Sequence, residues 1–161
     1  MQIEQARIED AREIMRWFPD KESVVRWGSP YMSYPLKDDT FFGDIYWDRI
    51  TSCVARTEDG HLLAFGQYYR KLGRCHLARL VINPEFRGQG LGEKFVGALM
   101  KQGGRMLGTD EFSLYVMTAN RPAYNCYKNL GFDLAQPPED DVRLEDVVFM
   151  VSNRPGDDAS A

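Results

Sequence analysis

The sequence INPEFRGQGLGEK, residues 82–94, is the most informative part of the chain. The run CHLARLVI that leads into it, residues 75–82, has the apolar pattern of a strand, and the apolar residues that follow recur at helical spacing. The sequence therefore predicts a strand, a glycine-rich loop and a helix over residues 90–103. Alternate glycines let a backbone approach a ligand closely, and a helix start offers free N–H groups to an anion. We expect this loop to bind a pyrophosphate, with Arg87 as a forked cation beside it.

Two other phosphate-binding loops do not match this stretch. A Walker A loop needs Gly-Lys followed by Ser or Thr, whereas here Glu93 separates Gly92 from Lys94 and Phe95 follows the lysine. The dinucleotide pattern G-x-G-x-x-G would need a glycine at position 93. What remains is the pattern Arg-x-x-Gly-x-Gly over residues 87–92.

A second block, NRPAYNCYKNLGF at residues 120–132, follows after one intervening strand. Asn120 can cap a helix while its side chain stays near a ligand in the preceding cleft. Tyr127, two turns later, projects from the same helix face, and Ala123 keeps that face small. The block predicts a helix over residues 120–130 with a phenol directed at the ligand.

Together the two blocks resemble the GCN5-related N-acetyltransferase (GNAT) family over residues 51–132. The resemblance implies a mixed α/β fold with a mostly antiparallel central sheet flanked by helices, in which a splayed strand pair forms the acetyl-coenzyme A cleft. It also implies an N-acetyltransferase that uses acetyl-coenzyme A as co-substrate, without a metal. In such enzymes a primary amine attacks the thioester directly in a ternary complex.

The resemblance also implies roles for individual residues. Leu80, Val81 and Ile82 would pair through their backbone with the pantetheine arm, and the Leu80 N–H would polarise the thioester carbonyl. Asn120 would bind the cofactor arm, and Tyr127 is the candidate general acid for the thiolate leaving group. The pyrophosphate amides would come from Gly88, Gln89, Gly90, Leu91, Gly92 and Glu93, with the Arg87 side chain as the cation beside them.

The general base and the acceptor-binding groups are open from the sequence. His76 is the first candidate base, because imidazole titrates near working pH and some relatives carry a catalytic Glu or His at this place on the strand. A water molecule, with His76 in a structural role, is the alternative. Arg79 could orient an acidic group of the acceptor or lie at the surface. Glu111, Asp44 and Asp48 are further candidates for binding an amine.

Other segments predict the remaining elements of one domain over residues 1–151. Gly103 and Gly104 are expected to end the helix that follows the loop. Residues 152–161 are small and polar and are expected to form a flexible tail. The expected strands cover residues 2–8, 51–57, 61–70, 75–82, 112–117 and 147–151, with an extended piece from residue 131, and the expected helices cover residues 9–18, 20–27 and 37–49, besides the two named above.

Composition excludes several classes of function. The 161 residues carry a net charge of -4 and scattered basic residues, which argues against nucleic acid as a partner. The three cysteines form no closely spaced pair, so neither a disulfide framework nor a zinc site is indicated. No apolar stretch is long enough to span a membrane. We expect a cytoplasmic monomer or homodimer that does not bind membranes.

The acceptor and two rival functions also remain open. A protein N-terminus, a lysine, a polyamine, an aminoglycoside or an amino-acid-like metabolite would each fit the motifs. The aromatic residues of the first fifty positions would suit a cationic or flat acceptor, although core packing also explains them. A non-catalytic acetyl-coenzyme A sensor of the same fold is the main alternative function, and a loop for another phosphate ligand is a third.

Overall fold

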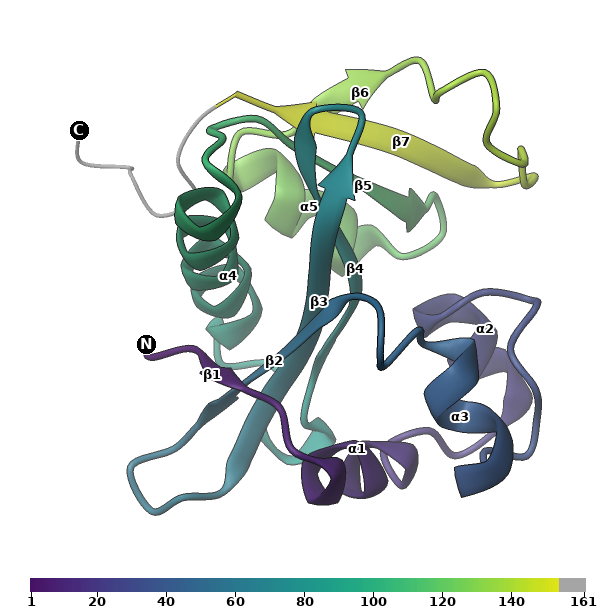
Figure 1. Ribbon diagram of the computed structural model, residues 1–161, viewed down its shortest axis with the longest axis vertical. Helices are drawn as coiled ribbons and strands as arrows, with labels where there is room; N and C mark the ends of the chain where they lie inside the picture. The colour runs from purple at the N-terminus through teal and green to yellow at the C-terminus, as the bar shows by residue number, and fades with distance from the viewer. Residues whose placement is uncertain (154–161) are drawn as a thin grey trace.

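The computed structural model describes residues 1–153 and places a mixed sheet at the centre of the molecule (Figure 1). Within that range the sheet has seven strands in the order β1-β2-β3-β4-β5-β7-β6. All neighbours are antiparallel except β4 and β5, which run parallel, so the predicted α/β fold is confirmed. The strands are β1 (Glu4–Gln5), β2 (Thr51–Arg56), β3 (Leu62–Lys71), β4 (Arg74–Ile82), β5 (Phe112–Met117), β6 (Asp133–Ala135) and β7 (Val147–Ser152).

Helices cover both faces of the sheet, and each face has its own core. On one face Phe95 and Leu99 pack with Cys53, and on the other Ile14 and Phe41 pack with Val54. Successive side chains of a strand point to opposite faces, which is why Cys53 and Val54 enter different cores. The helices are α1 (Ile8–Met15), α2 (Lys21–Trp27) and α3 (Asp38–Asp44) on one face, and α4 (Leu91–Leu107) and α5 (Arg121–Asn129) on the other.

A β-bulge interrupts the pairing of β3 with β4. The register passes from Phe65 opposite Val81 to Gln67 opposite Ala78, so Arg79 and Leu80 together face Gly66. Arg79 has a positive φ of 51°, a backbone conformation that residues other than glycine adopt only at a cost in free energy. The bulge bends β4 and interrupts its ladder with β3 at Arg79 and Leu80, and pairing resumes at Val81 and Ile82.

Strands β4 and β5 then diverge. Their parallel pairing is confined to Cys75 with Phe112 and His76 with Ser113. The remainder of β5, from Leu114 to Met117, pairs with β7 on its other side. A splayed pair of strands is therefore present, and the backbone of β4 beyond the bulge is not bonded to β5.

The expected end of α4 at Gly103 and Gly104 is wrong. The helix continues through both glycines to Leu107 and ends at Gly108, whose φ of 67° is left-handed. A Cβ atom at Gly103 would lie 2.7 Å from the sulfur of Cys75, and one at Gly104 would lie 2.7 Å from the carbonyl oxygen of Thr109. These glycines allow the helix to pack closely on the sheet. From the sequence alone, a glycine with this role looks the same as a glycine that ends a helix.

Other boundaries also differ from expectation, among them the end of the first helix, which is expected at residue 18 and lies at Met15. The opening strand is reduced to Glu4–Gln5. The helix expected over residues 37–49 ends at Asp44, and Tyr46 shortly after it has a positive φ of 55°. The last strand runs to Ser152, so the tail expected from that residue begins later, and its residues 154–161 lie outside the described part of the chain.

Candidate functional site

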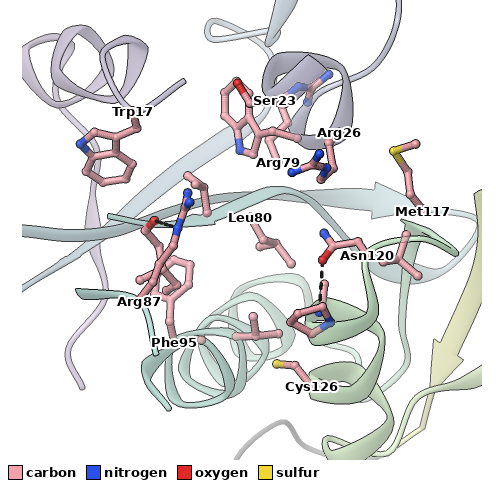
Figure 2. A pocket seen from close by; sticks show the side chains of 18 of the residues that line it. Trp17, Ser23, Arg26, Arg79, Leu80, Arg87, Phe95, Met117, Asn120 and Cys126 are labelled. Carbon is pink, nitrogen blue, oxygen red and sulfur yellow. Dashed lines mark hydrogen bonds between the residues drawn. The ribbon is translucent and has the colours of Figure 1, made fainter. Parts of the chain in front are cut away.

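A cavity of about 800 Å³ opens where β4 and β5 diverge (Figure 2). Its walls come from the bulged end of β4, the glycine-rich loop, the first turns of α4 and α5, and the end of β5. A further wall comes from residues 17–27, which form the turn before α2 and α2 itself. Residues 82–94, residues 120–132 and the segment around α2 thus line one cavity, although they lie far apart in the sequence.

The glycine-rich loop is anchored at its start and open along its length. The side chain of Asn83 donates to the Leu62 carbonyl (2.8 Å) and accepts from the Glu85 N–H (3.0 Å). Gly88 and Gly90 have positive φ values of 79° and 73°, and no atom lies within 4 Å of a Cβ built at either. Gly90 is the N-cap of α4, so the free N–H groups of this helix start at the cavity, as an anion site requires.

Arg87 is the exposed cation of this loop. Its Nε donates to the Ile82 carbonyl over 3.3 Å, which holds the stem of the side chain and leaves both terminal nitrogens available (Figure 2). An anion bound at the start of α4 would therefore meet a preoriented guanidinium. These residues fit the pyrophosphate of a coenzyme A thioester, and they do so by backbone conformation and charge.

Asn120 and Tyr127 both line the cavity from α5. Asn120 caps this helix by accepting from the Ala123 N–H over 3.4 Å. Tyr127 is 8% exposed and packs edge-on against Phe132. Burial raises the pKa of the Tyr127 phenol well above its usual value, with a smaller contribution from Cys126. The phenol is therefore protonated at neutral pH, as a general acid must be.

His76 lies away from the cavity. It is 4% exposed, its Nδ1 lies 2.8 Å from the Ser113 hydroxyl, and the rings of Tyr69, Tyr115 and Phe149 surround it. Burial lowers its pKa to about 4. A base that cannot reach the bound amine cannot accept its proton, so this placement speaks against the catalytic role expected of His76.

The other sequence-derived candidates divide between the cavity and the surface. Leu80, Val81 and Ile82 line the cavity, as do Arg87, Gly88, Gly90, Leu91 and Gly92 of the loop. The side chains of Gln89 and Glu93 are exposed and outside its lining. The acidic candidates Asp44, Asp48 and Glu111 are not part of the lining either, and Glu111 pairs with Arg74 at 3.7 Å.

Three lining residues had no motif to reveal their role. Arg79 enters the cavity from the bulge, and Arg26 and Trp27 enter it from α2. The Nε atoms of Arg79 and Trp27 are buried without a hydrogen-bond partner in the described part of the chain. The sequence left open an acceptor role for Arg79, but nothing local in the sequence indicates that α2 lies over β4.

The arrangement of metal-ligating side chains, thiols and apolar helices in residues 1–153 also bears on the chemistry of the chain. Within that range no group of three or more His, Cys, Asp or Glu side chains could hold a metal ion. Cys53 and Cys75 are buried, which raises their pKa values to about 12, and Cys126, on the cavity wall, has its pKa raised by burial to about 11. Nor does any helix in this range have the length and apolar character to cross a membrane.

Comparison with known sequences identifies a family, and a curated relative illustrates the match. The model of the acetyltransferase (GNAT) family matches residues 12–132. A Bacillus subtilis (strain 168) protein, provisionally named ribosomal protein bS18-alanine N-acetyltransferase, is 28% identical over 101 residues. The match covers 60% of this chain and 64% of the relative, slightly less than two thirds of its length.

Comparison with solved structures finds the same architecture at low identity. The aminoglycoside-bound AAC(6')-Ib, in complex with ribostamycin and coenzyme A, superposes with a TM-score of 0.75 at 20% identity, covering 99% of this chain and 96% of that one. Spermidine N-acetyltransferase from Vibrio cholerae, in complex with coenzyme A and spermine, gives 0.72 at 15% identity and covers 93% of both chains. At these identities the likeness establishes the fold.

Proposed function

Because the chain belongs to the acetyltransferase (GNAT) family, we propose that it transfers the acetyl group of acetyl-coenzyme A to a primary amine by direct attack in a ternary complex. One observation carries this proposal: a single cavity brings together the anion-binding loop, the bulged end of β4 and the phenol of Tyr127. Each supplies one requirement of acyl transfer from a thioester. These are a grip on the coenzyme, a donor for the carbonyl oxygen and an acid for the leaving thiolate.

The chain's own residues divide this work. The N–H groups at the start of α4, with Arg87, hold the pyrophosphate and so fix the thioester along β4. The backbone of Leu80, Val81 and Ile82, bonded to no neighbour in β5, is free to pair with the pantetheine arm. The Leu80 N–H stabilises negative charge that develops on the thioester oxygen. Asn120 lines the cavity at the start of α5 and completes its wall.

Tyr127 protonates the departing thiolate. Its raised pKa keeps the proton on the phenol until a strong base forms beside it, and its position on the cavity wall supports this role for a thioester bound in the cavity. A sensor that only binds acetyl-coenzyme A would have no use for this acid. The cavity therefore favours the transferase over the non-catalytic alternative.

Water is the proposed proton acceptor for the attacking amine. Asp20 and Glu22 are the only carboxylates in the cavity lining among the described residues, and Asp20 is occupied in capping α2. No histidine of that part of the chain lines the cavity. A chain of water molecules to the mouth of the cavity can remove the proton without a dedicated side chain.

The similar proteins suggest two classes of amine acceptor. Two proteins similar to this chain are named for acetylation of an alanine of a ribosomal protein, provisionally, and of spermidine, and a third was solved with ribostamycin and coenzyme A bound; each of these compounds presents a primary amine. We therefore propose a protein amine or a small-molecule amine as acceptor.

Two measurements test the proposal. Isothermal titration with acetyl-coenzyme A, coenzyme A and ATP should show binding of the first two and none of ATP; the reverse pattern rejects the loop assignment. Thiol release across a panel of amines, followed by mass measurement, should identify an acetylated product. Tight binding of acetyl-coenzyme A without thiol release from any amine would favour the sensor.

A further inference from the structure

We propose that the acceptor is a small amine that also carries a carboxylate, and that Arg79 binds this carboxylate beside the reacting carbonyl. The inference rests on the proposed acetyl transfer and narrows its acceptor class. It arises from a cation that lines the cavity without a carboxylate partner within residues 1–153.

The direct contacts of Arg79 are with neutral groups, and the Asp44 carboxylate acts on it only through space, more weakly than burial does. Its Nη1 donates to Oε1 of Gln67 over 2.8 Å, its Nη2 lies 3.5 Å from the Asp44 carbonyl, and its guanidinium lies 5.5 Å from the centre of the Tyr46 ring. The Asp44 carboxylate instead accepts from the Ser33 N–H. A guanidinium this enclosed loses hydration, and it normally regains that energy from an anion.

Gln67 makes this arrangement rigid. The Gln67 side chain is fully buried, and its amide nitrogen donates to the Ile45 carbonyl (2.8 Å) and to the Ser52 hydroxyl (2.9 Å). Those two bonds fix which end of the amide faces Arg79. Since a preorganised donor loses little entropy when a ligand arrives, Arg79 is suited to hold a carboxylate in one orientation.

Two neighbours from α2 add hydrogen-bond donors to this wall, which also carries the carboxylates of Asp20 and Glu22. The indole N–H of Trp27 is buried without a partner among the described residues, and it belongs to a residue that lines the same cavity. Among the described residues Arg26 pairs only with the largely exposed Glu22 at 3.1 Å, a surface contact of little energy. In Figure 2 Arg26 and Arg79 lie along one edge of the cavity, with Leu80 nearby. Each of these groups donates hydrogen bonds, so their ligand must accept them.

The place of Arg79 in the chain sets the size of the acceptor. It precedes Leu80, whose N–H faces the thioester carbonyl in the proposed reaction. A carboxylate on Arg79 therefore lies within one side-chain length of the amine that attacks. An amino acid, or a compound with the same pair of groups, has this spacing. A polycation would place positive charge against Arg26 and Arg79, and in the described lining only the carboxylates of Asp20 and Glu22 would offset this repulsion.

Matched substrates test the proposal. Thiol release should be measured for a set of amino acids and for their carboxamides, which keep the size and lose the charge, with spermidine and an aminoglycoside as polycationic arms. We expect kcat/KM for the best acid to exceed that of its carboxamide by about 10- to 100-fold, as loss of a charged hydrogen-bond pair produces.

Variants of Arg79 then test whether this residue causes the preference for the acid over its carboxamide. Arg79→Gln should bring the acid-to-amide ratio close to one, Arg79→Lys should restore part of it, and the Kd for acetyl-coenzyme A should stay within about twofold. Arg74→Gln is the matched control, since Arg74 is on the same strand and outside the cavity lining. It should leave the ratio unchanged. Thermal unfolding of each variant shows whether the fold is retained.

Four outcomes overturn the carboxylate proposal. These are equal use of acid and amide by the wild type, an equal loss for both substrates in Arg79→Gln, weakened acetyl-coenzyme A binding in that variant, or turnover of polyamines alone. The last would leave the proposed acetyl transfer intact. Absence of thiol release from every amine would instead reject acetyl transfer and this inference with it.

Discussion

Leu80 packs directly over Gly66, and a Cβ atom at position 66 would lie 2.7 Å from Cδ2 of Leu80. The same atom would lie 2.8 Å from Cδ2 of Leu99 on α4. The bulge thus depends on a glycine in the neighbouring strand. It is this gap that lets Leu80 turn its side chain into the core while its backbone faces the cavity.

Replacing Gly66 should therefore disturb both stability and cofactor binding. Gly66→Ala is expected to lower the free energy of unfolding by about 1–3 kcal/mol, because the added methyl overpacks the core between β3 and α4. The displaced Leu80 should also weaken acetyl-coenzyme A binding. Urea denaturation and calorimetry measure the two effects.

Gly43→Ala is the matched control for this change. Gly43 lies in α3, and nothing is within 4 Å of a Cβ atom at that position. The substitution should stabilise the protein slightly through helix propensity. Wild-type stability and binding in Gly66→Ala would show that the bulge tolerates a side chain at this position.

The anion-binding loop depends on backbone conformation at Gly90. With a φ of 73°, alanine there costs about 1 kcal/mol and distorts the start of α4. We expect Gly90→Ala to weaken acetyl-coenzyme A binding by at least about tenfold. Gly60→Ala, in the β2–β3 turn with a φ of 86°, should cost similar stability and leave the affinity unchanged. Equal affinities in the two variants would contradict the role of the loop.

Local segments could be predicted because their physics is local. Residues 82–94 contain a strand end, a loop and a helix start, and residues 120–132 contain a cap, a helix and its end; both blocks line the cavity. The hairpin of β2 and β3 follows equally from alternation and a turn at Gly60. In each case the residues that determine the structure are neighbours in sequence.

Features set by distant neighbours could not be predicted. Gly103 is next to Cys75, and Gly104 is next to Phe112 and Thr109, so their role depends on where α4 meets the sheet. His76 lies on the expected strand, but its burial depends on rings from β3, β5 and β7. Arg79 and α2 meet only in the folded chain. The acceptor side of the cavity therefore required the structure.

A partly buried ion pair joins α1 to β2. Nη2 of Arg56 lies 2.7 Å from the Asp10 carboxylate, and the two side chains are 15% and 5% exposed. Asp10→Asn leaves the guanidinium without its main partner and should cost about 3–5 kcal/mol of unfolding free energy. Asp38→Asn, which breaks the exposed pair with Arg12, should cost at most about 1 kcal/mol. Urea denaturation measures the unfolding free energy of both variants. Similar losses would contradict the larger contribution expected of the pair between Asp10 and Arg56.

Tyr127→Phe tests the general acid. Removal of the phenol should lower kcat on the order of 100-fold, because the thiolate must then leave unprotonated, while the Kd for acetyl-coenzyme A stays nearly constant. Tyr124→Phe removes a phenol from the same helix outside the cavity lining and should leave kcat unchanged. If Tyr127→Phe turns over at the wild-type rate, another proton source serves the leaving group.

His76 should make stability depend on pH. In the unfolded chain its imidazole takes up a proton near pH 6.5, whereas in the folded protein burial lowers the pKa to about 4. Between these values the unfolded state binds more protons, so stability falls as the pH drops from 6.5 to about 4. Lys71 lowers the pKa further, and Asp141 opposes it. At about 1.4 kcal/mol per unit, the contribution of His76 across this range is roughly 3 kcal/mol.

The variant His76→Gln should remove this contribution. Urea denaturation at several pH values between 4 and 7 should give a flatter stability curve for the variant than for the wild type, because glutamine has no proton to gain. Parallel curves would show that His76 titrates normally and is less enclosed than the structure indicates. The pH profile of kcat/KM gives an independent check. If His76 were the general base, its substitution would remove one limb of that profile. If His76 is buried and neutral, and the proton of the amine passes to water, the substitution leaves the shape of the profile unchanged.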